Sequence, residues 1–336
     1  MKYILVLLLA CLIASPSARG VGSTNEAPVA LQSIEIAWAA RTNEWPENLW
    51  VYKVIPQQFS EAVISNVMFV GSFTTKDRTQ PPDGRAHDSK AICFGSAARK
   101  GLVISPSQGY IGYHDELALG MQEGPVKGVL EPLTGVPDEA ETTKLGLKYL
   151  RLAGVDVSQL ATKPGTTDLD LRWSRGTRGY NDKAGAEINE TNSYGVSFSR
   201  RIDGISVQPL GMRGGMFISF GNHTKVVDLQ VCWRNLQPYQ LHDCPSPGQI
   251  GQWLRDGRIY MHKLGSKITY PRHEIRKLTV TKLQFLYSGE PGDRPMDFVL
   301  PYAIFEATAE TQQGTNTVWF QSPMTFANEN WHAIMN

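Results

Sequence analysis

The stretch that decides the fold reads Arg201-Ile-Asp-Gly-Ile-Ser-Val207. An Asp-Gly pair between two β-prone runs is a strong short-range signal of a two-residue hairpin turn, because both turn residues must adopt positive φ. The stretch follows a helix-like segment at residues 136–154, and alternating apolar runs continue after it to Leu236. This order predicts a small antiparallel sheet laid against a helix.

Residues 136–154 have the pattern of an amphipathic helix. Acidic residues crowd the first turn, where they favour the helix dipole, and Gly154 ends the segment. Ala140, Leu147 and Leu150 lie on a broad apolar stripe that needs a cover. The strands expected to supply that cover are residues 169–173, 195–199, 205–207, 216–220 and 226–233.

A shorter version of the same plan follows. Ser246-Pro-Gly-Gln249 combines a helix-capping serine, a proline suited to the first turn and a glutamine at the capping-box position. Alternating runs suited to strands come after it, at residues 259–262, 275–287, 298–308 and 317–321. We therefore predict an α+β fold in which antiparallel sheets are each packed on a helix, with tandem repeats at about 136–236 and 246–321.

The N-terminal half also mixes strands with a helix. Strands are expected at residues 34–38, 49–54, 91–94, 102–104 and 110–113, and a helix at residues 56–70. A stretch rich in glycine and proline, residues 120–135, suggests a domain boundary near Pro132. The expected domains are residues 21–131, an N-terminal α+β domain, and residues 132–336. Whether the first is another copy of the repeat is left open.

Residues 1–20 are typical of a secretory signal peptide. A basic start precedes an apolar run that is well short of the ~20 residues needed to span a bilayer. Cleavage after Gly20 or Ser17 fits the small residues at these sites, and Gly20 is favoured. Lipidation at Cys11 is the alternative. The expected location is secreted or extracytoplasmic, with no membrane span after cleavage.

Charge and motifs exclude several classes of partner. Removal of Lys2 and Arg19 from the 33 basic residues leaves 31, against 32 acidic ones. A chain so close to neutrality disfavours nucleic acid binding by bulk charge. We identify no cofactor or metal motif, and Gly211-Met-Arg-Gly-Gly215 lacks the lysine of a phosphate loop.

Three cysteines remain after signal cleavage. Cys232 and Cys244 enclose a segment rich in turn-forming residues, and we predict a disulfide between them in an oxidising compartment. Cys93 is then left over, and its apolar neighbours favour a buried thiol over a reactive one.

Candidate catalytic residues are few. His114-Asp115-Glu116 places an imidazole beside two carboxylates, which could act as acid and base or bind a metal. Neighbours in sequence rarely converge on one atom, so these three are candidates for a test and no catalytic residue is assigned.

Candidate binding residues gather around the first expected sheet. Arginines there could receive an acidic peptide or carboxylate, and Trp173 lies in a polar setting that suits an exposed ring. If the sheet has an open edge, strand addition is the natural way for it to hold an extended partner. The candidates are Arg172, Trp173, Arg175, Arg178, Arg200, Arg201 and Arg213.

The residues that follow the helix also carry a family resemblance. Phe198-Ser-Arg-Arg-Ile-Asp-Gly-Ile-Ser-Val207, the glycine cluster after it and Val226-Val-Asp-Leu229 resemble PepSY-type domains and the propeptides of secreted metallopeptidases. Leu278 to Tyr287 and Leu300-Pro-Tyr-Ala-Ile-Phe-Glu306 are similar to the extracytoplasmic YycH and YycI regulators, which stack such units in tandem. The resemblance implies cystatin-like sheets wrapped on helices.

The leading functional hypothesis is therefore a non-enzymatic binding or regulatory protein. Its partner would be a protein or peptide, either a peptidase that it restrains or a signalling protein of the envelope. The alternatives are a secreted hydrolase that acts on peptides or glycans, and a structural envelope protein.

Overall fold

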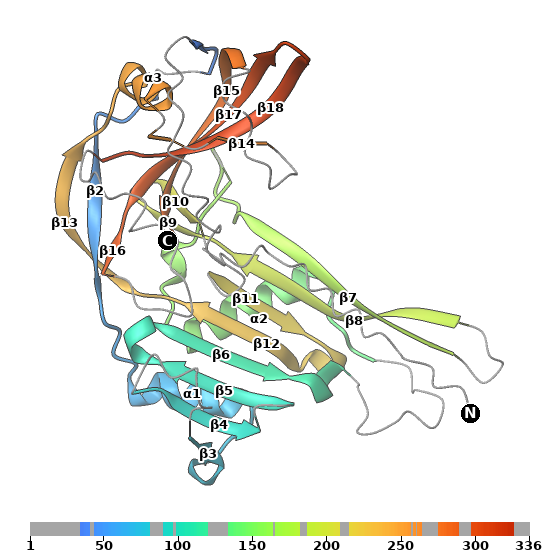
Figure 1. The fold of residues 1–336 in the computed structure, drawn as a ribbon. Coiled ribbons are helices and arrows are strands. Elements are labelled where there is room, and N and C mark those ends of the chain that lie inside the picture. The colour runs from blue at the N-terminus through green and yellow to red at the C-terminus, as the bar shows by residue number, and fades with distance from the viewer. Residues whose placement is uncertain are drawn as a thin grey trace.

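The computed structural model describes residues 34–325, except 41–43, 81–89, 97–98, 120–133, 164, 182–186, 209–214, 257, 260, 264–274 and 289–296. Within these residues the chain forms three α-helices and three sheets whose strands pair mostly antiparallel (Figure 1). The fold is mixed α and β and is dominated by its sheets. The described helices all lack the length and apolar character needed to cross a membrane.

An eight-stranded antiparallel sheet forms the larger part of the molecule. Its order is β3-β4-β5-β6-β12-β11-β8-β7. One face carries the apolar core, where Leu102, Ile218 and Leu229 have no exposed surface. The strands are β3 (Arg78–Thr79), β4 (Ile92–Ser96), β5 (Lys100–Ser105), β6 (Tyr110–Asp115), β7 (Leu171–Asn181), β8 (Glu187–Phe198), β11 (Met216–Phe220) and β12 (Val226–Cys232).

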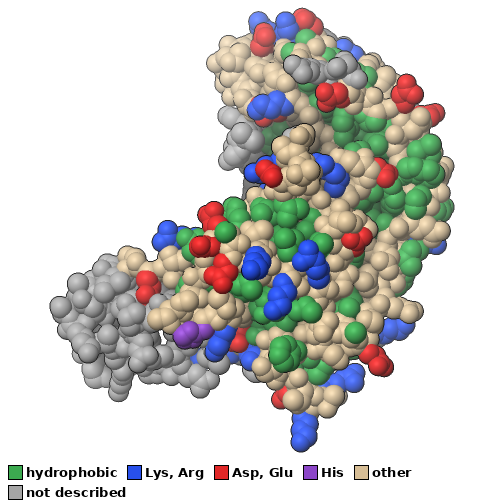
Figure 2. Space-filling view, turned by 180° about the vertical axis from the view of Figure 1, so that it is seen from behind, with side chains coloured by type: hydrophobic (Ala, Val, Ile, Leu, Met, Phe, Trp, Pro, Cys, Tyr) green, Lys and Arg blue, Asp and Glu red, His purple; other side chains and the backbone are tan. Residues whose placement is uncertain are grey.

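Two helices cover this core on one face, which lies behind the sheet in Figure 1 and faces the viewer in Figure 2. Helix α1 (Glu61–Val70) begins at Ser60, whose hydroxyl accepts from the Val63 N–H. Helix α2 (Glu139–Leu152) begins at Asp138, whose carboxylate accepts from the Glu141 N–H. A Cβ added at Gly146 would lie 3.0 Å from the Phe198 ring and 3.1 Å from Ile218, so the absence of a side chain lets α2 lie close to the sheet.

Each of these helices precedes four strands of the same sheet. Helix α1 precedes β3, β4, β5 and β6, and α2 precedes β7, β8, β11 and β12, with the two sets meeting where β6 pairs with β12. The helix-and-sheet pattern expected from residue 136 onward therefore also occurs at residues 61–115. One sheet takes strands from both sides of the boundary expected near residue 132.

A seven-stranded sheet forms a second lobe. Its order is β14-β18-β17-β15-β10-β9, and β1 pairs in parallel with β15. Helix α3 (Pro247–Arg255) packs on it through Ile250 and Leu254, and the predicted capping box at Ser246 and Gln249 is confirmed. The strands are β1 (Glu35–Trp38), β9 (Arg200–Ile202), β10 (Ile205–Gln208), β14 (Met261–Lys263), β15 (Ile275–Ser288), β17 (Pro301–Thr311) and β18 (Gly314–Pro323).

The Asp203-Gly204 hairpin turn is confirmed, with φ of 49° and 78° at the two residues. The hairpin does not lie in the sheet that α2 covers, however. Strand β10 pairs in parallel with β15 of the second lobe, so β9 and β10 carry the chain from one sheet to the other. Residues 136–236 thus contribute strands to more than one sheet.

A three-stranded sheet connects the two lobes along one side (Figure 1). Its order is β13-β2-β16, with β2 (Asn48–Ile55) at the centre, β13 (Asn235–Asp243) on one side and β16 (Phe298–Val299) on the other. Val54, Tyr287 and Val299 are buried together beneath it.

The disulfide predicted between Cys232 and Cys244 is wrong, since both thiols are reduced. The intervening residues were expected to form a short loop, but they form β13, because β2 offers them a partner along its whole length. A nine-residue strand spans roughly 30 Å, which separates the two cysteines. The Cys232 thiol instead lies 4.0 Å from the Gln108 carbonyl oxygen.

Most other expected elements are confirmed, with shifted ends. The N-terminal helix begins at Glu61 rather than at Pro56, because the Ser60 hydroxyl caps its first turn. Residues 1–20, the leader after them, and most of the segment 120–135 lie outside the described residues.

Candidate functional site

His114, Asp115 and Glu116 do not converge. His114 and Asp115 are consecutive in β6, so their side chains point to opposite faces of the sheet. Asp115 is buried on the helix side, where its carboxylate accepts from the Tyr113 hydroxyl at 3.1 Å and from the Ala118 N–H at 3.3 Å, and lies 3.7 Å from the Lys100 ammonium. Burial, and then the Asp115 carboxylate, raise the pKa of Tyr113. Glu116 is exposed at the start of a 3-10 turn.

His114 faces Asp228 instead. The two are register partners on β6 and β12, and Ser219 on β11 is the next partner along the same row. Leu229, Tyr113 and Ile218, which adjoin this row in the sequence, all point into the helix-covered core. The row of His114, Asp228 and Ser219 therefore lies on the other face of the sheet. Asp228 stands between the other two, which is the wrong order for a triad in which a histidine activates a serine.

This face is called the open face because both described helices that pack on the sheet lie on the opposite side. A second row on the open face runs parallel to the first. Gln230 on β12 has Phe217 as its register partner on β11 and Gly112 on β6. The Gln230 amide donates to the Asp228 carboxylate at 3.3 Å, which joins the two rows. All four polar side chains of the two rows are partly or fully buried.

The predicted binding residues on β7 divide between the two faces of the sheet. Arg172 has Ser197 as its register partner and lies on the open face, whereas Trp173 and Arg175 lie on the helix side. Arg172 and Arg175 are exposed, Trp173 is 38% exposed, and the Arg175 Nε donates to the Thr191 hydroxyl at 2.7 Å. For Arg178 only its place in β7 is described, and Arg213 lies outside the described residues.

Strand β7 is also an edge strand. It pairs with β8 on one side and with no described strand on the other. Residues 161–163 cover the edge just before β7 begins. The Asp170 N–H donates to the Ala161 carbonyl, and the Lys163 N–H donates to the Asp168 carbonyl. The uncovered edge thus begins near Leu171, and Figure 1 shows β7 and β8 extending beyond the rest of the sheet as an arm.

Arg200 and Arg201 have structural partners. The Arg200 guanidinium stacks 4.1 Å from the Trp233 ring centre and donates to the Arg234 carbonyl and to the Gln159 side chain. Arg201 donates through both terminal nitrogens to Thr162. These contacts hold the start of β9 against the neighbouring segments, so Arg201 is not displayed for a ligand.

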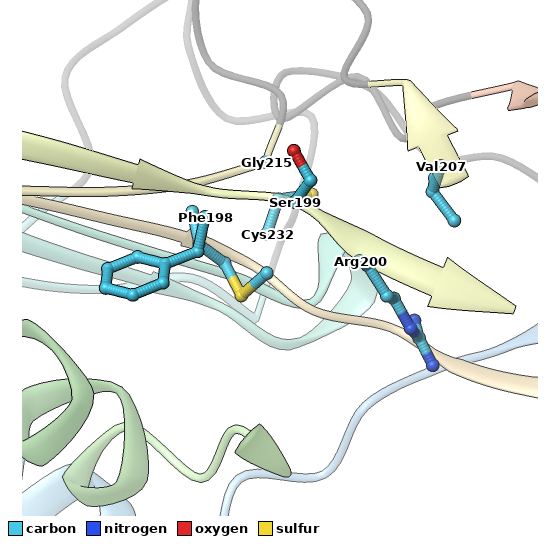
Figure 3. A pocket seen from close by; sticks show the side chains of 7 residues that line it. Phe198, Ser199, Arg200, Val207, Gly215 and Cys232 are labelled. Atoms are coloured by element: carbon cyan, nitrogen blue, oxygen red, sulfur yellow. The ribbon is translucent and has the colours of Figure 1, made fainter. Parts of the chain in front are cut away.

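A small pocket opens beside β9, at the end of β8 (Figure 3). Its volume of about 20 Å³ suits a water molecule rather than an organic substrate. In Figure 3 the Arg200 side chain extends away from Ser199 and Cys232. The lining residues are Phe198, Ser199, Arg200, Val207, Gly215, Met216 and Cys232.

No group of three or more His, Cys, Asp or Glu side chains could hold a metal ion within the described part of the chain. The residues that sequence reasoning missed are Asp228, Gln230 and Ser219. A signal for them is present in Val226-Val-Asp-Leu-Gln-Val-Cys232, where polar residues alternate with buried apolar ones, as in a strand with one open face.

Comparison with known proteins yields neither a matching family model nor a matching curated protein. Among solved structures, the fold is similar to that of an uncharacterized protein from Eubacterium rectale. The sequence identity is 8%, 88% of each chain is covered, and the TM-score is 0.45.

Proposed function

We propose that the protein is a non-enzymatic binding protein that works outside the cytoplasm and holds an extended, acidic segment of a partner protein. The observation that carries this proposal is β7, an eleven-residue edge strand with exposed arginines. The main-chain groups along such an edge can hydrogen-bond an added strand, and pockets or charges for alternate side chains then supply specificity.

The positions of the arginines define the partner further. Arg172 and Arg175 are three residues apart and therefore project from opposite faces of the sheet. An added strand that matches both would carry acidic residues an odd number of positions apart, one for each face. Trp173 offers a partly exposed ring beside Arg175, on the helix side.

The resemblance to PepSY-type domains supports the choice of partner class. In this proposal each helix and its four strands form a cystatin-like unit, and the segment that is held belongs to a peptidase or to an envelope signalling protein. The apolar run of residues 1–20 supports the location outside the cytoplasm.

The test measures binding of a fluorescein-labelled peptide. The peptide alternates threonine and valine and carries two glutamates three positions apart; a second peptide carries lysines in their place. We expect only the acidic peptide to bind. Its affinity should fall with added salt, because exposed charges are screened.

Two charge-reversal double variants separate a site on β7 from a general charge effect. Arg172→Glu with Arg175→Glu should weaken binding by about tenfold or more, equivalent to about 1.4 kcal/mol. Lys144→Glu with Lys148→Glu changes the net charge by the same amount on the exposed side of α2 and should leave binding unchanged. Equal losses in the two variants, or binding of the lysine peptide, would refute the proposal.

A further inference from the structure

The open face of the eight-stranded sheet has a composition that structural packing alone does not require. Figure 1 looks onto this face, with the helices behind it. The helix side carries leucine, isoleucine and phenylalanine at its centre. The open side carries His114, Ser219, Asp228 and Gln230 at the corresponding positions of β6, β11 and β12.

Two aromatic side chains lie across this polar surface. A Cβ added at Gly195 would lie 2.7 Å from two ring carbons of Phe217, and a Cβ added at Gly112 would collide with the Tyr110 hydroxyl and ring. Each ring therefore covers a glycine instead of standing upright from the sheet. Both rings keep part of their surface exposed.

The rings and the polar groups form one surface. Tyr110 covers Gly112 on its own strand β6, whereas Phe217 leans from β11 over Gly195 on β8, so three strand spacings of about 4.8 Å separate the strands beneath the two rings. Between them β12 contributes Gln230 and Asp228. We call Tyr110, His114, Phe217, Ser219, Asp228 and Gln230 the open-face platform.

We propose that the open-face platform binds a neutral oligosaccharide. Aromatic rings that lie along a surface offer their faces to the C–H groups of a sugar, and few convergent polar groups suffice to orient a ligand. Amide, imidazole, hydroxyl and carboxylate groups together match sugar hydroxyls, which both donate and accept. The six side chains of the platform include no lysine or arginine that could pair with an acidic sugar, which favours a neutral chain.

This site is independent of the peptide site proposed on β7, because none of its six residues lies on that strand. The failure of one proposal would therefore leave the other standing. The two sites would allow the protein to contact a glycan and a polypeptide at the same time.

The test is titration calorimetry of the full chain with neutral hexasaccharides of glucose, xylose, mannose and N-acetylglucosamine, and with a hexamer of galacturonic acid as the acidic comparison. We expect at least one neutral hexasaccharide to bind with a Kd of about 1 mM or lower. If none of the four binds with a Kd of about 1 mM or lower, or if the galacturonic acid hexamer binds as tightly as the best of them, the proposal is overturned.

Variants locate the binding. Tyr110→Leu and Phe217→Leu remove a ring but keep an apolar side chain, and each should weaken binding by about 3- to 10-fold. Tyr110→Phe keeps the ring and should retain most of the affinity. Phe69→Leu, at an 83%-exposed position on α1 on the helix side, is the matched control. Circular dichroism confirms that each variant is folded. If Phe69→Leu weakened binding equally, or if neither Tyr110→Leu nor Phe217→Leu had an effect, the sugar would bind elsewhere and the proposal would be overturned.

Discussion

The hydroxyl of Tyr52 donates a hydrogen bond to the carboxylate of Asp203, which joins β2 to the tip of the β9–β10 hairpin. Tyr52 is buried and packs edge-on against Tyr287, while Asp203 is exposed at the turn. Burial, and then the bond to Asp203, raise the pKa of Tyr52. The Asp203-Gly204 turn therefore also links the β9–β10 hairpin to the three-stranded sheet, through the hydrogen bond from Tyr52.

We expect Tyr52→Phe to lower the free energy of unfolding by about 1 kcal/mol, since the ring remains and only the hydrogen bond is lost. Urea denaturation followed by circular dichroism measures the change. Tyr239→Phe, at a position 56% exposed, is the control and should have no effect. A Tyr52→Phe protein as stable as the parent would mean that the bond contributes nothing.

Gly146→Val should destabilise the protein by about 1–3 kcal/mol, because the added side chain overpacks the contact between α2 and the sheet. The contact with Phe198 and Ile218 leaves no room for it. The same substitution at Gly248, where an added Cβ would meet nothing closer than 3.8 Å, tests the cost of valine in a helix without overpacking. Comparable thermal midpoints for the two variants would contradict this view of the α2 interface.

Reductant should not change the stability of the chain. Removal of a native disulfide typically costs about 2–5 kcal/mol, whereas Cys232 and Cys244 are both thiols here. Denaturation without reductant, followed by alkylation and peptide mass spectrometry, should find both cysteines alkylated. Recovery of a linked Cys232–Cys244 peptide would restore the disulfide that the sequence suggests.

Stability should fall as the pH rises into the alkaline range. Burial, and then Asp243, raise the pKa of Cys244 to about 11, and burial raises the pKa of Tyr113, Tyr287 and Tyr302. In the unfolded chain, thiols ionise near pH 8.5 and tyrosines near pH 10. The unfolded state therefore releases protons that the folded state keeps, and the free energy of unfolding decreases with pH.

Urea midpoints measured from about pH 7.5 to about pH 10.5 check this dependence. Burial also raises the pKa of Cys93, so both thiols contribute between about pH 8.5 and about pH 10, and Cys244→Ser should make that part of the curve less steep. An unchanged midpoint across the whole range would show that these groups ionise equally in the two states.

Local signals in the sequence predicted local structure well. The capping box at Ser246 and the Asp203-Gly204 turn each depend on a few neighbouring residues, and both are present as expected. The segment from Asn235 to Asp243 was misjudged for the same reason. Its Asn235, Pro238 and Asp243 favour turns locally, but pairing with β2 holds the segment extended.

The candidate site depends on partners that are distant in the sequence. The apparent neighbours His114 and Asp115 separate because a strand alternates its side chains, and Asp228 comes to His114 only through the pairing of β6 with β12. No spacing rule within one segment encodes that pairing. The alternation in β12 could have predicted an open polar face, but not which side chains lie opposite it.

The junction of β6 and β12 also governs how the chain folds during synthesis. Strand β6 is synthesised long before its partner β12, and the separation in sequence between β1 and its partner β15 is longer still. Loop-closure entropy must be overcome before such pairings form, which slows folding. Until residue 232 has been synthesised, β6 presents an unpaired edge. We therefore expect the nascent N-terminal half to bind holding chaperones, and to gain protease resistance only once β12 and β15 have left the ribosome.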